Sequence, residues 1–464
     1  MNSNFSKLTV RFFLIIVLIL TKCAFAQEYQ RIEELAELFL EQTKLPGISM
    51  AISKDGEIVY AKGFGQANLK ASIPMDSNMQ FRTASIAKVL TATALGRLAT
   101  EGKLNFDDTI GMHVTYIDKQ YKDLTIRQLA GHTSGLQHRP SRKGYKNKQF
   151  IRMKETLPFI TAPLLFEPNS AYQYSTNAFN LLGVIIEEVS GLSYEDYMQE
   201  YIFKPLKMMQ TFAENISKLS SNDVQLYYMK NGKPLKEKLT NGSYKLPGAG
   251  FRSTPTDLVK LTNAYTNGMI SKEVVAQMFK NNILSNEDKT NVGITWRLSK
   301  DIFGNQAMEH AGSWRGARTV LVYYPEEELA ISLMINATCQ VLIEETAHIF
   351  TELFRISTES LTKIDVNQNV TVRYNSKEGI RLFNGLIQVE GNRGFLKTEA
   401  DNFLAYNELF KISETIYAMI TDFGLLYLET SENNVANGKV YAYSNRNEIN
   451  PKEKPPLIEF FSEN

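Results

Sequence analysis

Residues 81–88 read FRTASIAK, and the rest of the chain can be interpreted outward from this stretch. From residue 85 onward apolar side chains recur at helical spacing until Gly102, a typical stop signal. The spacing therefore predicts a helix over 85–102 with Ser85 in its first turn. There the Ser85 hydroxyl and the Lys88 amine share one helix face a single turn apart, close enough to exchange a proton.

The spacing of Ser85 and Lys88 allows two interpretations. In the first, the positive end of the helix disfavours a protonated lysine, so that Lys88 acts as a base and activates Ser85. In the second, Ser85 is an N-cap and Lys88 is an ordinary solvated side chain. Because serine and lysine are common residues, the spacing often arises by chance, and taken alone it favours the second interpretation.

The segments on either side of this helix predict one sheet built from distant parts of the chain. Strand patterns occur at 48–53 and 57–62, around a turn at Asp55-Gly56, and return at 317–323 and 329–335. Helices are expected at both ends and throughout the middle, over 31–43, 178–189, 194–201, 257–266 and 344–354. We therefore predict an α/β (α+β) fold, with an antiparallel sheet flanked by terminal helices, an inserted helical region, and an active site where the two parts meet.

Beyond residue 357 the pattern changes to short alternating strands, which predicts a separate domain. The expected strands cover 370–374, 382–389, 416–421 and 440–443. The predicted organisation is a signal peptide over 1–26, a catalytic domain over 27–356 and a small β-rich domain over 357–464. One hypothesis for the last domain is that it roofs the active site.

The first twenty-six residues have the pattern of an export signal. Lys7 and Arg11 give a basic start, 12–20 a short apolar run, and 24–26 a small-residue exit. The apolar run is much shorter than the roughly 20 residues that cross a bilayer, so a membrane anchor is disfavoured. Lipidation at Cys23 is a lesser alternative. We expect an exported protein, periplasmic or secreted, with no membrane span after cleavage.

Composition excludes several classes of function. Fifty-one Lys and Arg balance fifty Asp and Glu, so no net field attracts nucleic acid. After cleavage Cys339 is the single cysteine, which excludes an internal disulfide and a thiolate metal site, and its apolar neighbours suggest a core position. The five histidines lack the helical spacing of a zinc protease. We expect neither a metal nor a cofactor.

Later motifs, read in order, favour the catalytic interpretation of Ser85. After FRTASIAK the chain reads LAGHTSG at 129–135, YQYST at 172–176, PLKMMQT at 205–211, GFRST at 250–254 and HAG at 310–312. This series resembles the penicillin-binding-protein-like and class C β-lactamase-like serine hydrolases over about 27–354. With residues 241–245, NGSYK, it is most similar to the branch that includes the mitochondrial β-lactamase-like serine protease. The resemblance implies a β-lactamase/transpeptidase-like fold.

The resemblance also implies roles for individual residues. Ser85 would be the nucleophile, with Lys88 and Tyr174 sharing the general-base and general-acid work. The backbone N–H groups of Ser85 and Ser313 would bind the oxyanion. The remaining substrate-binding residues implied by the family pattern are His310, Gly312 and Thr176. Tyr174 could instead be an ordinary half-buried tyrosine, and His132 is expected to have a structural role.

Departures from the family pattern bear on the substrate. The HAG motif replaces the Lys-Thr-Gly of efficient β-lactamases and removes a cation that would hold a carboxylate. Thr176 stands where many relatives carry asparagine. We therefore expect hydrolysis of an amide or ester, with a small peptide, ester or cell-wall-like substrate. The alternatives are a D-Ala-D-Ala carboxypeptidase or weak β-lactamase, and a non-catalytic ligand-binding or assembly module of the same fold.

Overall fold

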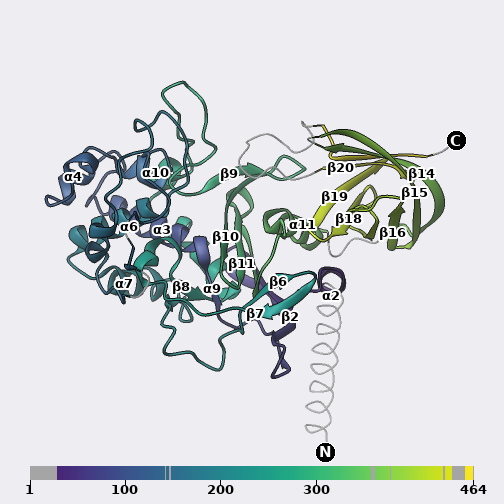
Figure 1. Ribbon diagram of the computed structural model, residues 1–464, viewed down its shortest axis with the longest axis horizontal. Coiled ribbons are helices and arrows are strands. Elements are labelled where there is room, and N and C mark those ends of the chain that lie inside the picture. The colour runs from purple at the N-terminus through teal and green to yellow at the C-terminus, as the bar shows by residue number, and fades with distance from the viewer. Residues whose placement is uncertain are drawn as a thin grey trace, which may run out of the picture.

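The computed structural model describes residues 29–141, 143–145, 148–356, 361–376, 378–431, 434–441 and 455–462 (Figure 1). The predicted signal peptide, with Cys23, lies outside these residues. In the part of the chain that is described, no helix is both long enough and apolar enough to span a bilayer.

A seven-stranded antiparallel sheet forms the centre of the catalytic domain, in the order β3-β2-β1-β12-β11-β10-β9. Strand β1 pairs with β12, so that Ile48 lies opposite Ile335, and the strands from both ends of the segment share one sheet as predicted. The bounds are β1 Gly47–Lys54, β2 Glu57–Asn68, β3 Ile73–Pro74, β9 Arg297–Lys300, β10 Gln306–Trp314, β11 Ala317–Tyr324 and β12 Leu329–Ile335.

Both faces of this sheet are covered, which explains why its central strands are almost continuously apolar. Successive residues of β11 point to opposite faces: Val320 and Val322 join one core, whereas Leu321 and Tyr323 join the other. The first core contains the amphipathic helices α2 (Gln30–Thr43) and α11 (Ile343–Arg355). Half-buried Cys339 packs against this same core, close to the position expected from its neighbours.

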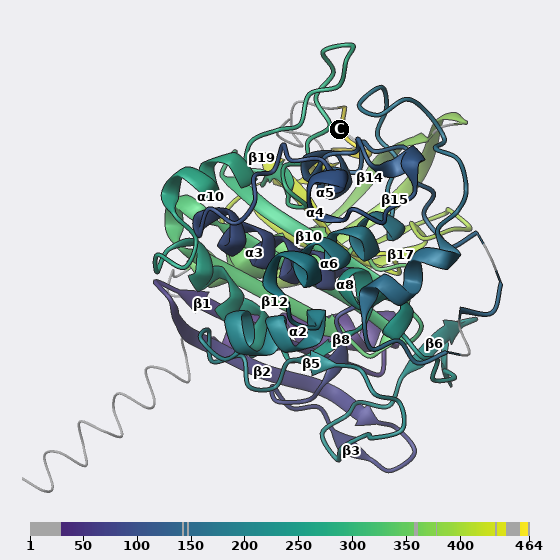
Figure 2. The same cartoon turned by 90° about the vertical axis from the view of Figure 1, so that its left-hand side faces the viewer.

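The second core belongs to the inserted helical region, which lies in front of the strands in Figure 2. Helix α3 (Ala87–Thr100) is buried on almost all sides, which suits a sequence composed mostly of alanine, leucine, valine, glycine and threonine. The α-helices of the inserted region are α3, α4 (Ile110–His113), α5 (Ile126–Ala130), α6 (Asn177–Ser190), α7 (Tyr194–Tyr197), α8 (Leu246–Ala249), α9 (Pro255–Lys260) and α10 (Lys272–Met278). The short strands are β4 (Phe81–Arg82), β5 (Phe212–Ala213), β6 (Tyr227–Lys230), β7 (Lys233–Lys236), β8 (Phe251–Ser253) and β13 (Ala337–Thr338).

Three predicted helices change type along their length. The helix predicted over 85–102 begins as a 3-10 turn, Ala84–Ile86, and ends at Thr100, two residues before Gly102 with its φ of +68°. The segment 194–201 continues from α7 as a π-helix, Met198–Phe203. The segment 257–266 divides into α9 and a 3-10 helix, Leu261–Tyr265. The remaining 3-10 helices are Lys119–Tyr121, Met153–Phe159, Ser243–Lys245 and Pro325–Glu327.

The C-terminal strands close into an eight-stranded barrel. The barrel packs against α2 and α11, as residues of β18 and β19 share their apolar core and Arg31 donates hydrogen bonds to the carbonyls of Lys411 and Ile412, at 2.7 and 2.8 Å. The strands are β14 (Ile364–Ser376), β15 (Gly379–Gly391), β16 (Arg393–Thr398), β17 (Tyr406–Lys411), β18 (Ile416–Thr421), β19 (Gly424–Ser431), β20 (Asn434–Tyr441) and β21 (Ile458–Ser462).

The barrel therefore lies across the sheet from the helical region (Figure 1). The hypothesis that this domain roofs the active site is not supported, because the barrel covers the sheet's other face through α2 and α11. The predicted fold class is confirmed: a mixed helix and sheet architecture with an antiparallel sheet, an inserted helical region and a small C-terminal β domain.

A buried ion-pair cluster joins the small strands β4, β5 and β8 next to the nucleophile segment. The Glu214 carboxylate accepts hydrogen bonds from Arg82, at 2.7 Å, and from Arg252, at 3.0 Å, and all three side chains are nearly inaccessible to solvent. Removing one member of such a cluster leaves a buried charge without compensation.

We predict that Glu214→Gln lowers the free energy of unfolding by about 3–5 kcal/mol, because two buried guanidinium groups lose their shared carboxylate. The exposed pair Glu200–Lys204 provides a matched control, for which Glu200→Gln should cost less than about 1 kcal/mol. Urea titration of the two variants measures the difference. Equal destabilisation would contradict the assigned role of Glu214.

Candidate active site

Ser85 lies at the junction of the helical region and the sheet, in the middle of the 3-10 turn Ala84–Ile86. The preceding Ala84 has a φ of +46°, a left-handed conformation that a side chain with a Cβ rarely adopts. Such strain persists only where the surrounding structure imposes it, and it is concentrated at functional sites. The half-buried Ser85 side chain lines the cleft described below.

Lys88 lies one turn beyond Ser85 and is completely buried. Its ammonium nitrogen donates hydrogen bonds to the carbonyl of Gly248, at 2.8 Å, and to Thr176 Oγ1, at 3.3 Å. Both acceptors are neutral. Burial, and to a lesser extent the charge of Arg297, holds the pKa of Lys88 well below 10.5. The structure thus provides a buried amine that is easily deprotonated, as the catalytic interpretation requires.

Tyr174 lies over Lys88, with the lysine nitrogen 4.9 Å from the centre of its ring. The ring is also close to three histidines: its centre is 4.3 Å from that of His132, 5.6 Å from that of His138 and 6.3 Å from that of His310. His132 Nδ1 accepts a hydrogen bond from the backbone N–H of Ser175 at 3.2 Å. That bond holds the tyrosine motif in place and agrees with a structural role for His132.

Gly312 brings strand β10 directly against the nucleophile turn. A Cβ atom at this position would lie 2.6 Å from the carbonyl oxygen of Thr83 and 2.9 Å from the backbone nitrogen of Ser85. Only glycine therefore permits this approach. The next residue, Ser313, is exposed and lines the cleft, which places the two proposed oxyanion donors on adjoining backbone segments.

His310 is not in the cleft, in contrast to the role implied by the family pattern. It shares a strand face with Gly312 but is only 1% exposed, and its ring centre lies 6.3 Å from that of Tyr174. Its Nδ1 lies 2.8 Å from the carbonyl oxygen of Ala311. Burial, and then the charges of Arg297 and Lys88, lower the pKa of His310 well below 6.5. His310 is therefore a neutral, buried side chain next to Tyr174.

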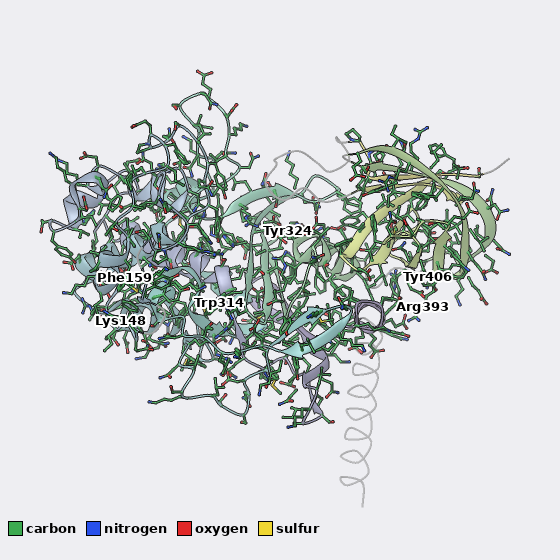
Figure 3. The ribbon with its side chains drawn as sticks, viewed as in Figure 1. Lys148, Phe159, Trp314, Tyr324, Arg393 and Tyr406 are labelled. Atoms are coloured by element: carbon green, nitrogen blue, oxygen red, sulfur yellow. The ribbon has the colours of Figure 1, made fainter. Side chains whose placement is uncertain are left out.

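A cleft of about 830 Å³ opens over Ser85 between the helical region and the end of β10. Of the predicted residues, Ser85, Thr176 and Ser313 line it. The other lining residues are His138, Arg139, Pro140, Tyr145, Asn177, Asn180, Ile216, Leu239, Thr240, Asn241, Tyr244, Lys245, Ala249, Trp314 and Arg315. Figure 3 shows Trp314 where the strands meet the helical region.

Fifteen lining residues were not identified as site residues from the sequence, and three of them, His138, Lys245 and Trp314, bear on the chemistry. Burial, and then the charge of Lys88, lower the pKa of His138 to about 4, so this ring is neutral at physiological pH. Lys245 belongs to the NGSYK motif, which indicated the branch of the family but assigned no role to the lysine side chain. Trp314 lies two residues after the HAG motif, next to Ser313. Among the described residues, no group of three His, Cys, Asp or Glu side chains could hold a metal ion.

Comparisons with known proteins identify the family. The protein-family model described as "Beta-lactamase" matches residues 32–343. The human serine beta-lactamase-like protein LACTB, mitochondrial, is 27% identical over 400 residues, covering 65% of this chain and 73% of that protein. Protein flp of Staphylococcus aureus (strain MW2) is 24% identical over 347 residues, covering 73% of this chain and 69% of that protein.

Solved structures share the fold. The octameric penicillin-binding protein homologue from Pyrococcus abyssi superposes with a TM-score of 0.58 at 23% identity, covering 89% of this chain and 97% of that chain. The D-amino acid amidase from Ochrobactrum anthropi SV3, complexed with L-phenylalanine, gives a TM-score of 0.58 at 23% identity over 66% of this chain and 91% of that chain.

The lowered pKa of Lys88 predicts the pH dependence of Ser85 labelling by a fluorophosphonate. An amine accepts a proton only when neutral, so the labelling rate should rise with pH and level off well below pH 10.5, the ordinary lysine value. Lys88→Met should reduce the rate about 10²–10⁴-fold, whereas the exposed Lys272→Met serves as a control without effect. A rate that continues to rise up to pH 10.5 would contradict the assignment of Lys88 as the base.

Proposed function

The chain belongs to the beta-lactamase family, and we propose that it is an exported serine hydrolase that cleaves an amide or ester bond, preferably in a peptide, through an acyl-enzyme on Ser85. The family comprises serine hydrolases, including amidases and esterases. The observation that carries the proposal is the fully buried Lys88, hydrogen-bonded only to neutral acceptors one helical turn from Ser85. The sequence pattern that predicts an export signal over 1–26 supports the proposed location.

In the first half of the reaction, Ser85 Oγ attacks the substrate carbonyl carbon while its proton passes to Lys88 Nζ. The carbonyl oxygen becomes an oxyanion, which the backbone N–H groups of Ser85 and Ser313 would hold. One such donor contributes about 2.7–4 kcal/mol in enzymes where it has been removed. When the tetrahedral intermediate collapses, the leaving nitrogen or oxygen receives a proton through Lys88 and the Tyr174 phenol.

In the second half, water attacks the acyl-enzyme ester and loses its proton to the same basic groups. Ser85 Oγ then leaves as the alkoxide and recovers a proton, so that the enzyme returns to its starting state. Lys88 Nζ lies 4.9 Å from the centre of the Tyr174 ring, so the two residues proposed to share the proton in both halves are neighbours.

Amide and ester substrates are favoured over β-lactams for a structural reason. The buried His310 stands where efficient β-lactamases present a lysine, and it does not reach the cleft. The amidase among the solved structures supports an amide substrate for the same fold. The non-catalytic alternative is disfavoured because Ser85 and a base within one helical turn are both present.

We predict that Ser85→Ala lowers kcat/KM for simple esters and peptide amides by at least about 10³-fold, because no nucleophile remains. Mass spectrometry of the wild-type protein should show a fluorophosphonate adduct on Ser85 that the variant lacks. The exposed Ser221→Ala is the control and should retain both turnover and labelling. Undiminished turnover by Ser85→Ala would refute the mechanism. Nitrocefin in the same panel tests the β-lactamase alternative.

A further inference from the structure

Lys245 is a second amine in the cleft, and the proposed mechanism does not use it. It ends the 3-10 turn Ser243–Lys245, is half-buried, and lines the cleft together with Ser85 and Ser313. Its nitrogen lies 3.7 Å from the centre of the Trp314 ring, a cation–π contact. In the part of the chain that the structure describes, this nitrogen has no hydrogen bond or ion pair with another residue.

The charges around Lys245 leave it without a counter-charge. Arg82 also contacts the Trp314 ring, at 4.1 Å, but each nitrogen of its guanidinium already has a partner: it pairs with Glu214 and donates to the carbonyls of Thr240 and Arg315, at 2.8 and 3.2 Å. Glu214 is shared with a second arginine as well. No carboxylate close to Lys245 is therefore available to balance its charge.

The cleft as a whole favours an anion. Its charged lining residues are Arg139, Lys245 and Arg315, and none of the described lining residues is acidic. Arg315, exposed at the rim, is 3.6 Å from Glu237, and Arg139 is exposed. Lys245 is thus the half-buried basic residue of this lining, and among the described residues its nitrogen has no hydrogen-bond or ion-pair partner. A cleft lined with one sign of charge concentrates ligands of the opposite sign.

We propose that the cleft selects substrates that carry a carboxylate, and that Lys245 is the residue that binds it. This inference rests on the proposed hydrolysis at Ser85 and adds the substrate class. A singly charged anion fits, because Lys245 supplies one ammonium group while the donors of Arg82 are already used. The Trp314 ring lies 3.7 Å from the Lys245 nitrogen and so helps to hold the side chain in the cleft.

The protonation behaviour of Lys245 agrees with this role. The pKa of Lys245 is lowered to about 6. The largest cause is burial, followed by the charges of Lys88 and Arg82; Glu214 partly opposes these effects, and Arg139 adds a smaller lowering. The amine is therefore mostly neutral at pH 7.5 in the free protein. A carboxylate placed against it would raise the pKa again, so binding takes up a proton and weakens as the pH is raised from 6 to 8.

A pair of matched esters tests the proposal. 4-Nitrophenyl pentanoate and 4-nitrophenyl hydrogen glutarate differ only in the terminal methyl or carboxylate. The same comparison on the leaving-group side uses acetyl-Ala-Ala and its C-terminal amide, in the L and D forms. We expect the wild type to favour the carboxylate in at least one pair by tenfold or more in kcat/KM, mainly through KM. Lys245→Met should abolish that preference, and Lys245→Arg should retain part of it.

Lys148→Met is the matched control, because Lys148 also lies over an aromatic ring, 5.3 Å from Phe159, but does not line the cleft (Figure 3). It should leave the preference unchanged. Circular dichroism and thermal unfolding establish that each variant is folded. A carboxylate preference absent from the wild type, unaltered in Lys245→Met, or equally lost in Lys148→Met would overturn the proposal.

Calorimetry on Ser85→Ala separates this inference from the proposed function. In two buffers of different ionisation enthalpy at pH 7.5, this variant should bind the peptide acid with uptake of up to one proton, and Ser85→Ala/Lys245→Met should not. Carboxylate binding that depends on Lys245, in a protein whose wild type hydrolyses nothing, would refute the hydrolase and keep the anion site. Hydrolysis with a carboxylate preference independent of Lys245 would refute the anion site and keep the hydrolase.

Discussion

The burial of one lysine without a carboxylate is the constraint on which the site depends. An ammonium group removed from water is costly unless it is paired, so a lysine in such a setting tends toward its neutral form. Lys88 is held there by a carbonyl from α8 and a hydroxyl at the start of α6. Three helices must therefore pack together before the base exists, and the chemistry is a property of the assembled helical region.

The sheet supplies the other half of the site through its backbone. Thr319 on β11 donates a hydrogen bond of 2.9 Å to the carbonyl of Thr83, just before the strained Ala84. On β10, Gly312 allows the strand to touch the backbone of Ser85. These two contacts fix the nucleophile turn against strands that begin more than two hundred residues later. The unfavourable conformation of Ala84 is thus imposed by long-range contacts.

Local patterns predicted strands of the sheet and most helices, because each depends on spacing within one segment, whereas the catalytic interpretation of Ser85 and Lys88 needed the later motifs and the family resemblance. Local patterns did not predict the burial of His310: strand alternation indicates the face of a side chain, whereas burial depends on residues distant in sequence, such as Tyr174. Lys245 was missed for a similar reason. A lysine differs from an ordinary surface lysine only through its surroundings. For Lys245 these include Trp314, which lies on a strand about seventy residues further along the chain, so local sequence patterns do not reveal the contact.

The far face of the sheet is joined to the active site through a buried arginine. Arg297 on β9 donates a 3.0 Å hydrogen bond to Glu344 on α11, the helix against which the barrel packs. The charge of Arg297 is also the second cause, after burial, of the lowered pKa of Lys88. The buried Arg297 guanidinium is therefore balanced by the Glu344 carboxylate, and its charge favours the neutral form of the Lys88 amine. Helix α11 thus has two roles: its apolar residues share a core with the barrel strands β18 and β19, and its Glu344 pairs with the arginine whose charge acts on Lys88.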